Sequence, residues 1–210
     1  MDFLGFKIQK GQVILQNHVL NVFSKFLDQI LDKTQLQRFL GSLNYIRPFY
    51  RGEATDIHLL QQILKKNPVK WSSEMTLAVW HIKAKVLDLP PLSLPQGSGQ
   101  LIIETYASSH TWGGVLLEAL EGKEHVYGYG SGSCKAAELK YLSSHKEILA
   151  VKKIIQYFFL FLKPVRFIIK TYLKVMPGIF KNQNLMAENS SRILKWFIWL
   201  SNFDLDIVIS

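Results

Sequence analysis

The side chains in this sequence that could support catalysis are a few carboxylates. Glu104 lies in the apolar run of residues 101–106, Glu147 lies in a longer apolar segment, and Asp204 and Asp206 lie near the end of the chain. Mg²⁺ binds hard anionic oxygens in near-octahedral geometry, so a cluster of such groups would support metal-assisted hydrolysis. A metal site also demands strict ligand geometry. We therefore interpret Glu104 as solvent-facing and the two aspartates as the polar side of an alternating strand.

Composition restricts other ligand chemistry. The single cysteine, Cys134, excludes an internal disulfide and a cysteine-based zinc site, and none of the six histidines forms a close pair at metal-ligand spacing. The N-terminus has no basic segment before an apolar core, so it does not resemble a signal peptide. We expect an intracellular protein, cytoplasmic or nuclear and not secreted.

The elements that must position these carboxylates lie within residues 100–210. Their order indicates an α/β (α+β) fold, in which three consecutive strands are followed by alternating helix and strand and the helices pack on a mixed sheet. The predicted strands are 101–106, 112–120, 125–130, 165–172 and 203–209, and the predicted helices are 143–162 and 191–199.

Residues 1–52 form a different pattern. Apolar residues alternate over 3–8, the chain turns at Lys10-Gly11 and apolar residues resume, which predicts a β-hairpin. Asp32 lies three residues before Gln35, the spacing of a helix N-terminal capping box, and apolar residues then recur at helical intervals until Pro48. This segment is predicted to be a hairpin followed by an amphipathic helix.

Residues 53–99 have the composition of a connecting segment. One helix is predicted to begin at Ser72 or Ser73, with an apolar stripe of Leu77, Trp80, Ala84 and Leu87. The segment ends in a run rich in Pro, Gly and Ser at 90–99, which is typical of a linker.

The net charge favours a polyanionic partner. The chain carries 25 Lys and Arg against 16 Asp and Glu, a formal charge of +9, and both halves of the sequence contribute. Such a balance suits nucleic acid, because each phosphate contact by Lys or Arg releases counterions. A membrane is not expected, since the most apolar run, 154–162, is much shorter than the roughly 20 residues of a membrane-spanning helix.

Taken in order, these segments resemble the reverse transcriptase and ribonuclease H region of retroelement polyproteins, in particular those of plant pararetroviruses such as badnaviruses. Residues 101–116 resemble the family's first ribonuclease H strand and hairpin, 129–151 its third strand and catalytic helix, and 167–172 a later strand. Residues 3–6 and 36–50 resemble the primer-grip hairpin and the thumb helix. The resemblance predicts a ribonuclease H-like mixed sheet with flanking helices, preceded by a small thumb and tether module.

The resemblance also implies which positions belong to the nuclease site. The family holds two Mg²⁺ ions with four carboxylates, and the two aspartates of its T-D pairs correspond to Tyr106 and Tyr172. Only Glu147 keeps a carboxylate, and the segment that carries the fourth lies beyond Ser210. A tyrosine phenol has a reference pKa of about 10, so it is neutral at pH 7 and cannot replace an ionised aspartate. We therefore expect no bound Mg²⁺ and no cleavage.

The thumb and primer-grip likeness implies a nucleic-acid surface as well. It maps onto Phe3, Leu4, Gly5, Gln35, Arg38 and Asn44. The polymerase fingers and palm would precede these residues, so DNA synthesis is not expected of this chain.

Three functions remain open at this point. The leading interpretation is a fragment of a retroelement polymerase polyprotein whose ribonuclease H-like domain is inactive. The alternative is a retained nucleic-acid-binding or interaction module that contacts RNA/DNA hybrid weakly through its positive charge. The third is an active hybrid nuclease that uses Glu147 with Glu104 or an aspartate.

Overall fold

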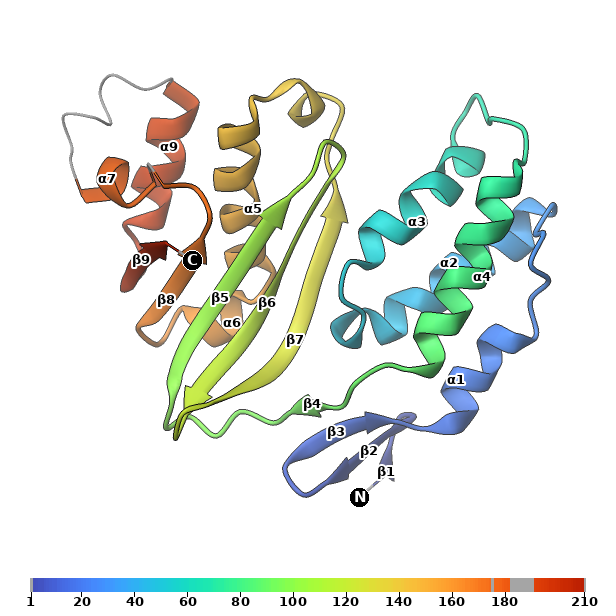
Figure 1. Cartoon of the computed structure of the whole chain (residues 1–210), viewed down its shortest axis with the longest axis horizontal. Coiled ribbons are helices and arrows are strands. Elements are labelled where there is room, and N and C mark those ends of the chain that lie inside the picture. The colour runs from blue at the N-terminus through green and yellow to red at the C-terminus, as the bar shows by residue number, and fades with distance from the viewer. Residues whose placement is uncertain (1, 175, 182–190, 210) are drawn as a thin grey trace. The chain divides into compact units, whose positions relative to one another are not determined.

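The chain folds into two compact units, residues 1–94 and residues 95–210. The structure is a computed structural model that describes residues 2–174, 176–181 and 191–209 (Figure 1). The division into segments 1–52, 53–99 and 100–210 is a finer one and stays a prediction.

The first unit contains the predicted hairpin within a small antiparallel sheet. The strands, in the order β1-β2-β3-β4, are β1 (Asp2–Phe3), β2 (Phe6–Gln9), β3 (Gln12–Leu15) and β4 (Leu92–Ser93). Lys10 and Gly11 connect β2 to β3 with φ angles of 50° and 73°. Two successive residues with positive φ match the right-handed twist of the flanking strands, which explains the turn at this position.

Four α-helices complete the first unit: α1 (Asn17–Ser24), α2 (Lys33–Ile46), α3 (Glu53–Gln61) and α4 (Ser73–Leu87). Short 3₁₀ turns, η1 (Arg47–Phe49) and η2 (Gln62–Leu64), follow α2 and α3. The predicted cap of α2 is present, because the Asp32 carboxylate accepts the Gln35 backbone N–H at 2.7 Å. The apolar positions of α2 that the sequence indicated are buried: Leu36, Phe39, Leu40, Leu43 and Ile46.

The predicted apolar stripe of α4 lies on one face of the helix, and that face is exposed. Leu77, Trp80 and Leu87 are more than 60% exposed, and Ala84 is also exposed. The buried stripe consists of Met75, Val79, Ile82 and Val86. Both stripes are apolar at helical spacing, so periodicity could not decide which one packs.

The run at 90–99 is held at several points. Leu92 and Ser93 pair with β3 as β4. The carboxylate of Glu118, which is fully buried, accepts the backbone N–H of Gly99 at 2.7 Å and that of Gln96 at 3.4 Å. The composition indicated a linker, and the structure ties both of its ends to sheets.

The second unit is built on a mixed five-stranded sheet in the order β7-β6-β5-β8-β9. Its strands are β5 (Gln100–Ala107), β6 (Thr111–Leu120), β7 (Lys123–Ser133), β8 (Phe167–Thr171) and β9 (Leu205–Ile209). The pairs β5–β6 and β6–β7 are antiparallel, whereas β8 is parallel to β5 and β9 is parallel to β8. All five strands that the sequence indicated are therefore present in one sheet.

Helices cover one face of this sheet. They are α5 (Ser143–Tyr157), α6 (Phe159–Leu162), α7 (Met176–Lys181) and α9 (Ser191–Leu200), with a 3₁₀ turn η3 (Glu138–Lys140) before α5. The core joins side chains of α5 and α9 to Ile103, Leu116 and Ile169 of the sheet. Figure 1 shows α5 running across the face of β5 and β6. The single helix predicted over 143–162 is interrupted at Phe158, where φ and ψ are −99° and 23°.

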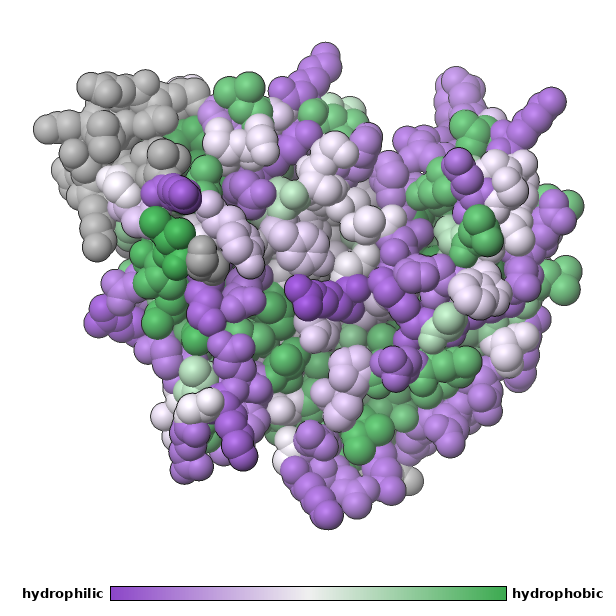
Figure 2. Space-filling model, viewed as in Figure 1, coloured by the Kyte–Doolittle hydropathy of each residue, from purple (hydrophilic) through white to green (hydrophobic). Residues whose placement is uncertain are grey.

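Hydrophilic and hydrophobic residues are interspersed over the face of the molecule that Figure 2 presents. Large apolar side chains remain exposed on α4 and α6, including Trp80 and Leu160. Within the described part of the chain, no helix is both long enough and apolar enough to cross a membrane.

Candidate functional site

Strand β5 places Tyr106 on the sheet face opposite α5. Residues 103 and 105 of β5 are buried on the helix-covered side, where Thr105 pairs with Gly114 and a Cβ at Gly114 would lie 2.8 Å from Ile154 of α5. Side chains alternate along a strand, so Tyr106 lies on the other face. There it is opposite Gly113 of β6, and a Cβ at Gly113 would collide with the Tyr106 ring. The Tyr106 ring therefore covers Gly113.

Strand β8 places Tyr172 level with Tyr106. The register of the parallel pair ends with Glu104 opposite Lys170, and Tyr106 and Tyr172 each follow two residues later, Tyr106 within β5 and Tyr172 directly after the end of β8. Tyr172 directly follows the buried Thr171 and is 74% exposed. The two tyrosines thus stand at matching positions at the ends of neighbouring strands.

Glu147 approaches the same end of β5 from the helix side. It lies in the second turn of α5 and is partly buried. Burial raises the pKa of the Glu147 carboxyl, and the backbone N–H of Ala107 partly offsets this by stabilising the anion. Ala107 directly follows Tyr106, so the structure brings Glu147 next to the strand end that carries Tyr106.

The other three carboxylates that the sequence singled out, Glu104, Asp204 and Asp206, form ion pairs with cations. Lys170 Nζ lies 3.1 Å from Glu104 and 2.9 Å from Glu124. Arg166 is 2.6 Å from Asp206 and 3.8 Å from Asp204. Among the described residues, no group of three or more His, Cys, Asp or Glu side chains is arranged to hold a metal ion. These residues do not fit the two-metal site that the sequence resemblance implies.

Sequence reasoning missed Lys170 and Gly113. Lys170 lies two residues before Tyr172, so the alternation of β8 assigns both to one face, and this spacing was readable in the sequence. The role of Gly113 depends on its pairing with Tyr106, which is not local.

The first unit exposes most of the predicted nucleic-acid surface. Gln35, Arg38 and Asn44 are exposed along α2, and Leu4 is 72% exposed. Phe3 belongs to β1, and its side chain lies outside the described part of the structure.

Leu4 and Gly5 form a tight turn beside α1 and α2. Their φ angles are 47° and 82°, and a Cβ at Gly5 would lie 2.7 Å from Val19 and 2.8 Å from the Tyr45 hydroxyl. Glycine is therefore required for both conformation and space. A shallow cavity of about 270 Å³ adjoins this turn, lined by Leu4, Gly5, His18, Val19, Val22, Phe23, Ser42 and Tyr45.

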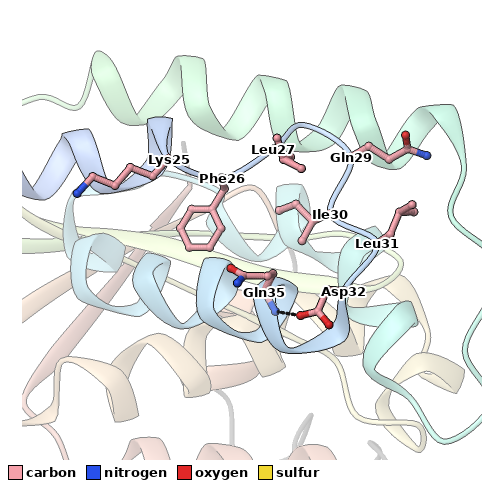
Figure 3. Close-up of a pocket in the computed structure, with 8 residues that line it drawn as sticks. All are labelled: Lys25, Phe26, Leu27, Gln29, Ile30, Leu31, Asp32 and Gln35. Atoms are coloured by element: carbon pink, nitrogen blue, oxygen red, sulfur yellow. Dashed lines mark hydrogen bonds between the residues drawn. The ribbon is translucent and has the colours of Figure 1, made fainter.

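A second cavity, of about 310 Å³, lies under the loop that connects α1 to α2 (Figure 3). Its lining is mainly apolar, with the Asp32 cap of α2 at one end, and comprises Lys25, Phe26, Leu27, Gln29, Ile30, Leu31, Asp32 and Gln35. It contains Gln35 but none of the nuclease-site positions.

Comparisons with known proteins agree with this geometry. A family described as "RNase H-like domain found in reverse transcriptase" matches residues 71–169. The enzymatic polyprotein of carnation etched ring virus is 39% identical over 209 residues, which cover 99% of this chain and 32% of the viral protein. That of figwort mosaic virus is 40% identical over 210 residues, which cover 99% of this chain and 31% of the viral protein. The chain thus spans about a third of these relatives.

Solved structures show the same fold. The foamy viral protease-reverse transcriptase in complex with dsDNA has a TM-score of 0.80 at 19% identity, covering 100% of this chain and 44% of that protein. The same enzyme in complex with an RNA/DNA hybrid also has a TM-score of 0.80, at 20% identity, and this chain covers 29% of it. The predicted ribonuclease H-like mixed sheet with flanking helices is confirmed. Residues 71–169 thus match the RNase H-like domain found in reverse transcriptase, and the chain is homologous over nearly its whole length to part of pararetroviral enzymatic polyproteins.

Proposed function

We propose that this region of the polyprotein does not cleave nucleic acid and binds no catalytic Mg²⁺. The observation that carries the proposal is the pair of tyrosines at matching positions at the ends of β5 and β8, with Glu147 as the remaining carboxylate beside Ala107. Two divalent ions about 4 Å apart require several anionic ligands to offset their mutual repulsion. One carboxylate and two neutral phenols supply too little negative charge.

The test is cleavage of an RNA strand paired with DNA. The chain and its Glu147→Ala variant are purified in parallel and assayed with Mg²⁺ and with Mn²⁺. We expect equal, background-level hydrolysis from both, because host ribonuclease H that copurifies would contribute equally. Hydrolysis by the native chain above the Glu147→Ala level would show an active hybrid nuclease instead.

A second function is supported by the first unit. We propose that Gln35, Arg38 and Asn44 of α2, with Phe3, Leu4 and Gly5 of the hairpin, contact an RNA/DNA hybrid weakly and without regard to sequence. The exposed face of α2 and the formal charge of +9 support this, as does the binding of dsDNA and RNA/DNA hybrid by the foamy viral protein of the same fold. Such a role would be exercised in the cytoplasm or the nucleus.

Salt dependence tests this second function. We expect hybrid affinity to fall steeply as salt rises, because phosphate contacts release counterions. Arg38→Ala should weaken binding and reduce the salt slope by roughly one unit. Lys33→Ala removes the same charge from another exposed position of α2 and serves as the matched control. Equal effects of the two variants, or binding insensitive to salt, would count against a specific α2 surface.

A further inference from the structure

The sheet face opposite α5 carries two aromatic rings at one end. Tyr172 is 74% exposed, and Tyr106, which is partly buried, lies over Gly113. Because Gly113 has no side chain, the Tyr106 ring rests against the sheet rather than standing on end. Tyr106 and Tyr172 each lie two residues beyond the paired Glu104 and Lys170 of adjacent parallel strands, which are about 4.8 Å apart, and Tyr172 directly follows the end of β8.

Aromatic side chains arranged in this way suit unpaired bases. Exposed rings on neighbouring strands of an open sheet stack successive bases of a single strand, and stacking tolerates any sequence because every base has a π-face. Bases in a duplex are already paired and stacked on one another, so they are not available to the rings. The geometry therefore favours single-stranded nucleic acid over a double helix.

The positive charges near the two rings are placed where they could contact the phosphates of a bound strand. Lys146 donates to the Ser109 carbonyl at 2.8 Å, which holds it at the turn that follows β5, and Lys174 is exposed two residues after Tyr172. Neither lysine takes part in the ion pairs found among the described residues. Lys170, on the other side of Tyr172, is neutralised by Glu104 and Glu124. Positive charge is thus available beyond the strand ends and not along the strands.

We propose that Tyr106 and Tyr172 form a base-stacking platform that binds single-stranded nucleic acid. Two consecutive bases would stack on the two rings, and Lys146 and Lys174 would contact the adjoining phosphates. The proposal rests on the proposed function in one respect, because a platform without catalytic Mg²⁺ leaves the bound strand intact. The affinity itself depends only on the rings and the two lysines.

The experiment measures binding of the whole chain to a fluorescein-labelled short oligothymidine by anisotropy. Tyr172→Ala should weaken binding roughly five- to 100-fold, the range expected for loss of one stacked base, whereas Tyr172→Phe keeps the ring and should bind like the native chain. Because Tyr172 is highly exposed, neither variant removes core packing. Trp80→Ala, which removes an aromatic residue that is 61% exposed on α4, is the matched control and should have no effect.

Two further probes separate stacking from charge. An abasic oligonucleotide of the same length keeps the phosphates but loses both stacked bases, so it should bind the native chain more weakly than oligothymidine binds Tyr172→Ala. A blunt duplex should bind the native chain and Tyr172→Ala equally. The proposal is overturned if Tyr172→Ala binds oligothymidine as the native chain does, or if the abasic strand binds as tightly as oligothymidine. Cleavage of a hybrid would overturn the proposed function and leave these binding results unaffected.

Discussion

At the scale of single residues, Tyr106 and Tyr172 differ from aspartates in both charge and volume. An aspartate at either position would add an anion at the same end of the sheet as Glu147, and like charges repel one another. A phenol adds no charge and covers apolar surface, as the Tyr106 ring covers Gly113. The tyrosines therefore favour a stable sheet end without metal, at the expense of metal binding.

Replacing both tyrosines with aspartate should favour metal binding and lower the stability of the metal-free chain. The double variant Tyr106→Asp/Tyr172→Asp adds two carboxylates at the end of the sheet that Glu147 approaches from the α5 side, and we expect weak Mg²⁺ binding detectable by calorimetry. Without Mg²⁺ the double variant should be less stable than the native chain, because the carboxylates repel one another and lose water. Added Mg²⁺ should then raise its melting temperature.

The double variant Tyr106→Phe/Tyr172→Phe is the control for the loss of the phenol hydroxyls, and its melting temperature should not respond to Mg²⁺. Equal responses of the two double variants would show that these positions do not form a metal site.

Glu147 should make stability depend on pH. Burial raises its folded-state pKa above the ordinary value of 4.5, so the folded chain holds this proton more tightly than the unfolded chain. Stability from this residue is then present at low pH and is lost as pH rises from 4.5 through the raised folded value. Glu147→Gln, which cannot ionise, should gain stability relative to the native chain over that range.

Urea unfolding at about pH 4 and about pH 7 measures this difference, since these values bracket the titration of a glutamate with a raised pKa. Glu121→Gln, in the exposed turn between β6 and β7, is the matched control. A difference between Glu147→Gln and the native chain that does not grow with pH would contradict the argument.

At the scale of elements, the pairing of β5 with β6 decides where the Tyr106 ring lies. Gly113 is directly opposite Tyr106, and the face of the ring occupies the space that a side chain at 113 would need. This close approach explains why a β-strand interior tolerates a glycine at that position. We therefore expect the two residues to be energetically coupled.

A double-mutant cycle tests the coupling. Gly113→Ala should destabilise the native chain by about 1–3 kcal/mol, the usual range for overpacking. In a Tyr106→Ala background the same substitution should be nearly neutral, which gives a coupling energy of about 1–3 kcal/mol. Gly41→Ala, in α2 with open space around its Cβ position, is the control and should stabilise the chain slightly. Additive effects of the two substitutions would show that the ring does not cover Gly113.

At the scale of the whole molecule, the first residues of the second unit, 96–99, are held by hydrogen bonds to Glu118. Burial alone would raise the pKa of Glu118, but the Tyr127 hydroxyl and the backbone N–H groups of Gly99, Gln96 and Ser98 stabilise the anion and hold the pKa below its ordinary value. The same contact and burial raise the pKa of Tyr127 to about 12. An ionised Glu118 therefore fixes the start of the second unit.

Breaking this contact should loosen the connection. Glu118→Gln keeps the volume but loses the anion, so we expect faster cleavage between residues 94 and 100 by a broad-specificity protease, read out by mass spectrometry. Because the folded-state pKa is lowered, the stabilisation is present above pH 4.5 and is lost as pH falls through the folded value.

Tyr127→Phe removes the hydroxyl that donates to Glu118 and accepts the Gln96 N–H but keeps the Gly99 N–H contact with Glu118, so its cleavage rate should lie between those of the native chain and Glu118→Gln. Unchanged cleavage in Glu118→Gln would mean that the carboxylate does not hold this segment.

Local features were readable from the sequence because each depends on neighbouring residues. The turn at Lys10-Gly11, the Asp32 cap and the five strands of the second unit follow from conformational preference and from periods of two or 3.6 residues. The sequence also showed that Tyr106 and Tyr172 occupy positions where the resembled family has aspartates. Helices α1, α3 and α7 were not predicted individually, since each has fewer than ten residues and short helices leave little periodic signal.

Only the tertiary structure decided which surfaces meet. Both stripes of α4 are apolar, and long-range packing, not periodicity, buries Val79 and exposes Trp80. The parallel register of β5 and β8, which levels Tyr106 with Tyr172, joins residues 66 positions apart, such as Glu104 and Lys170. Contacts at such separations depend on how the whole sheet assembles, because no local preference specifies them.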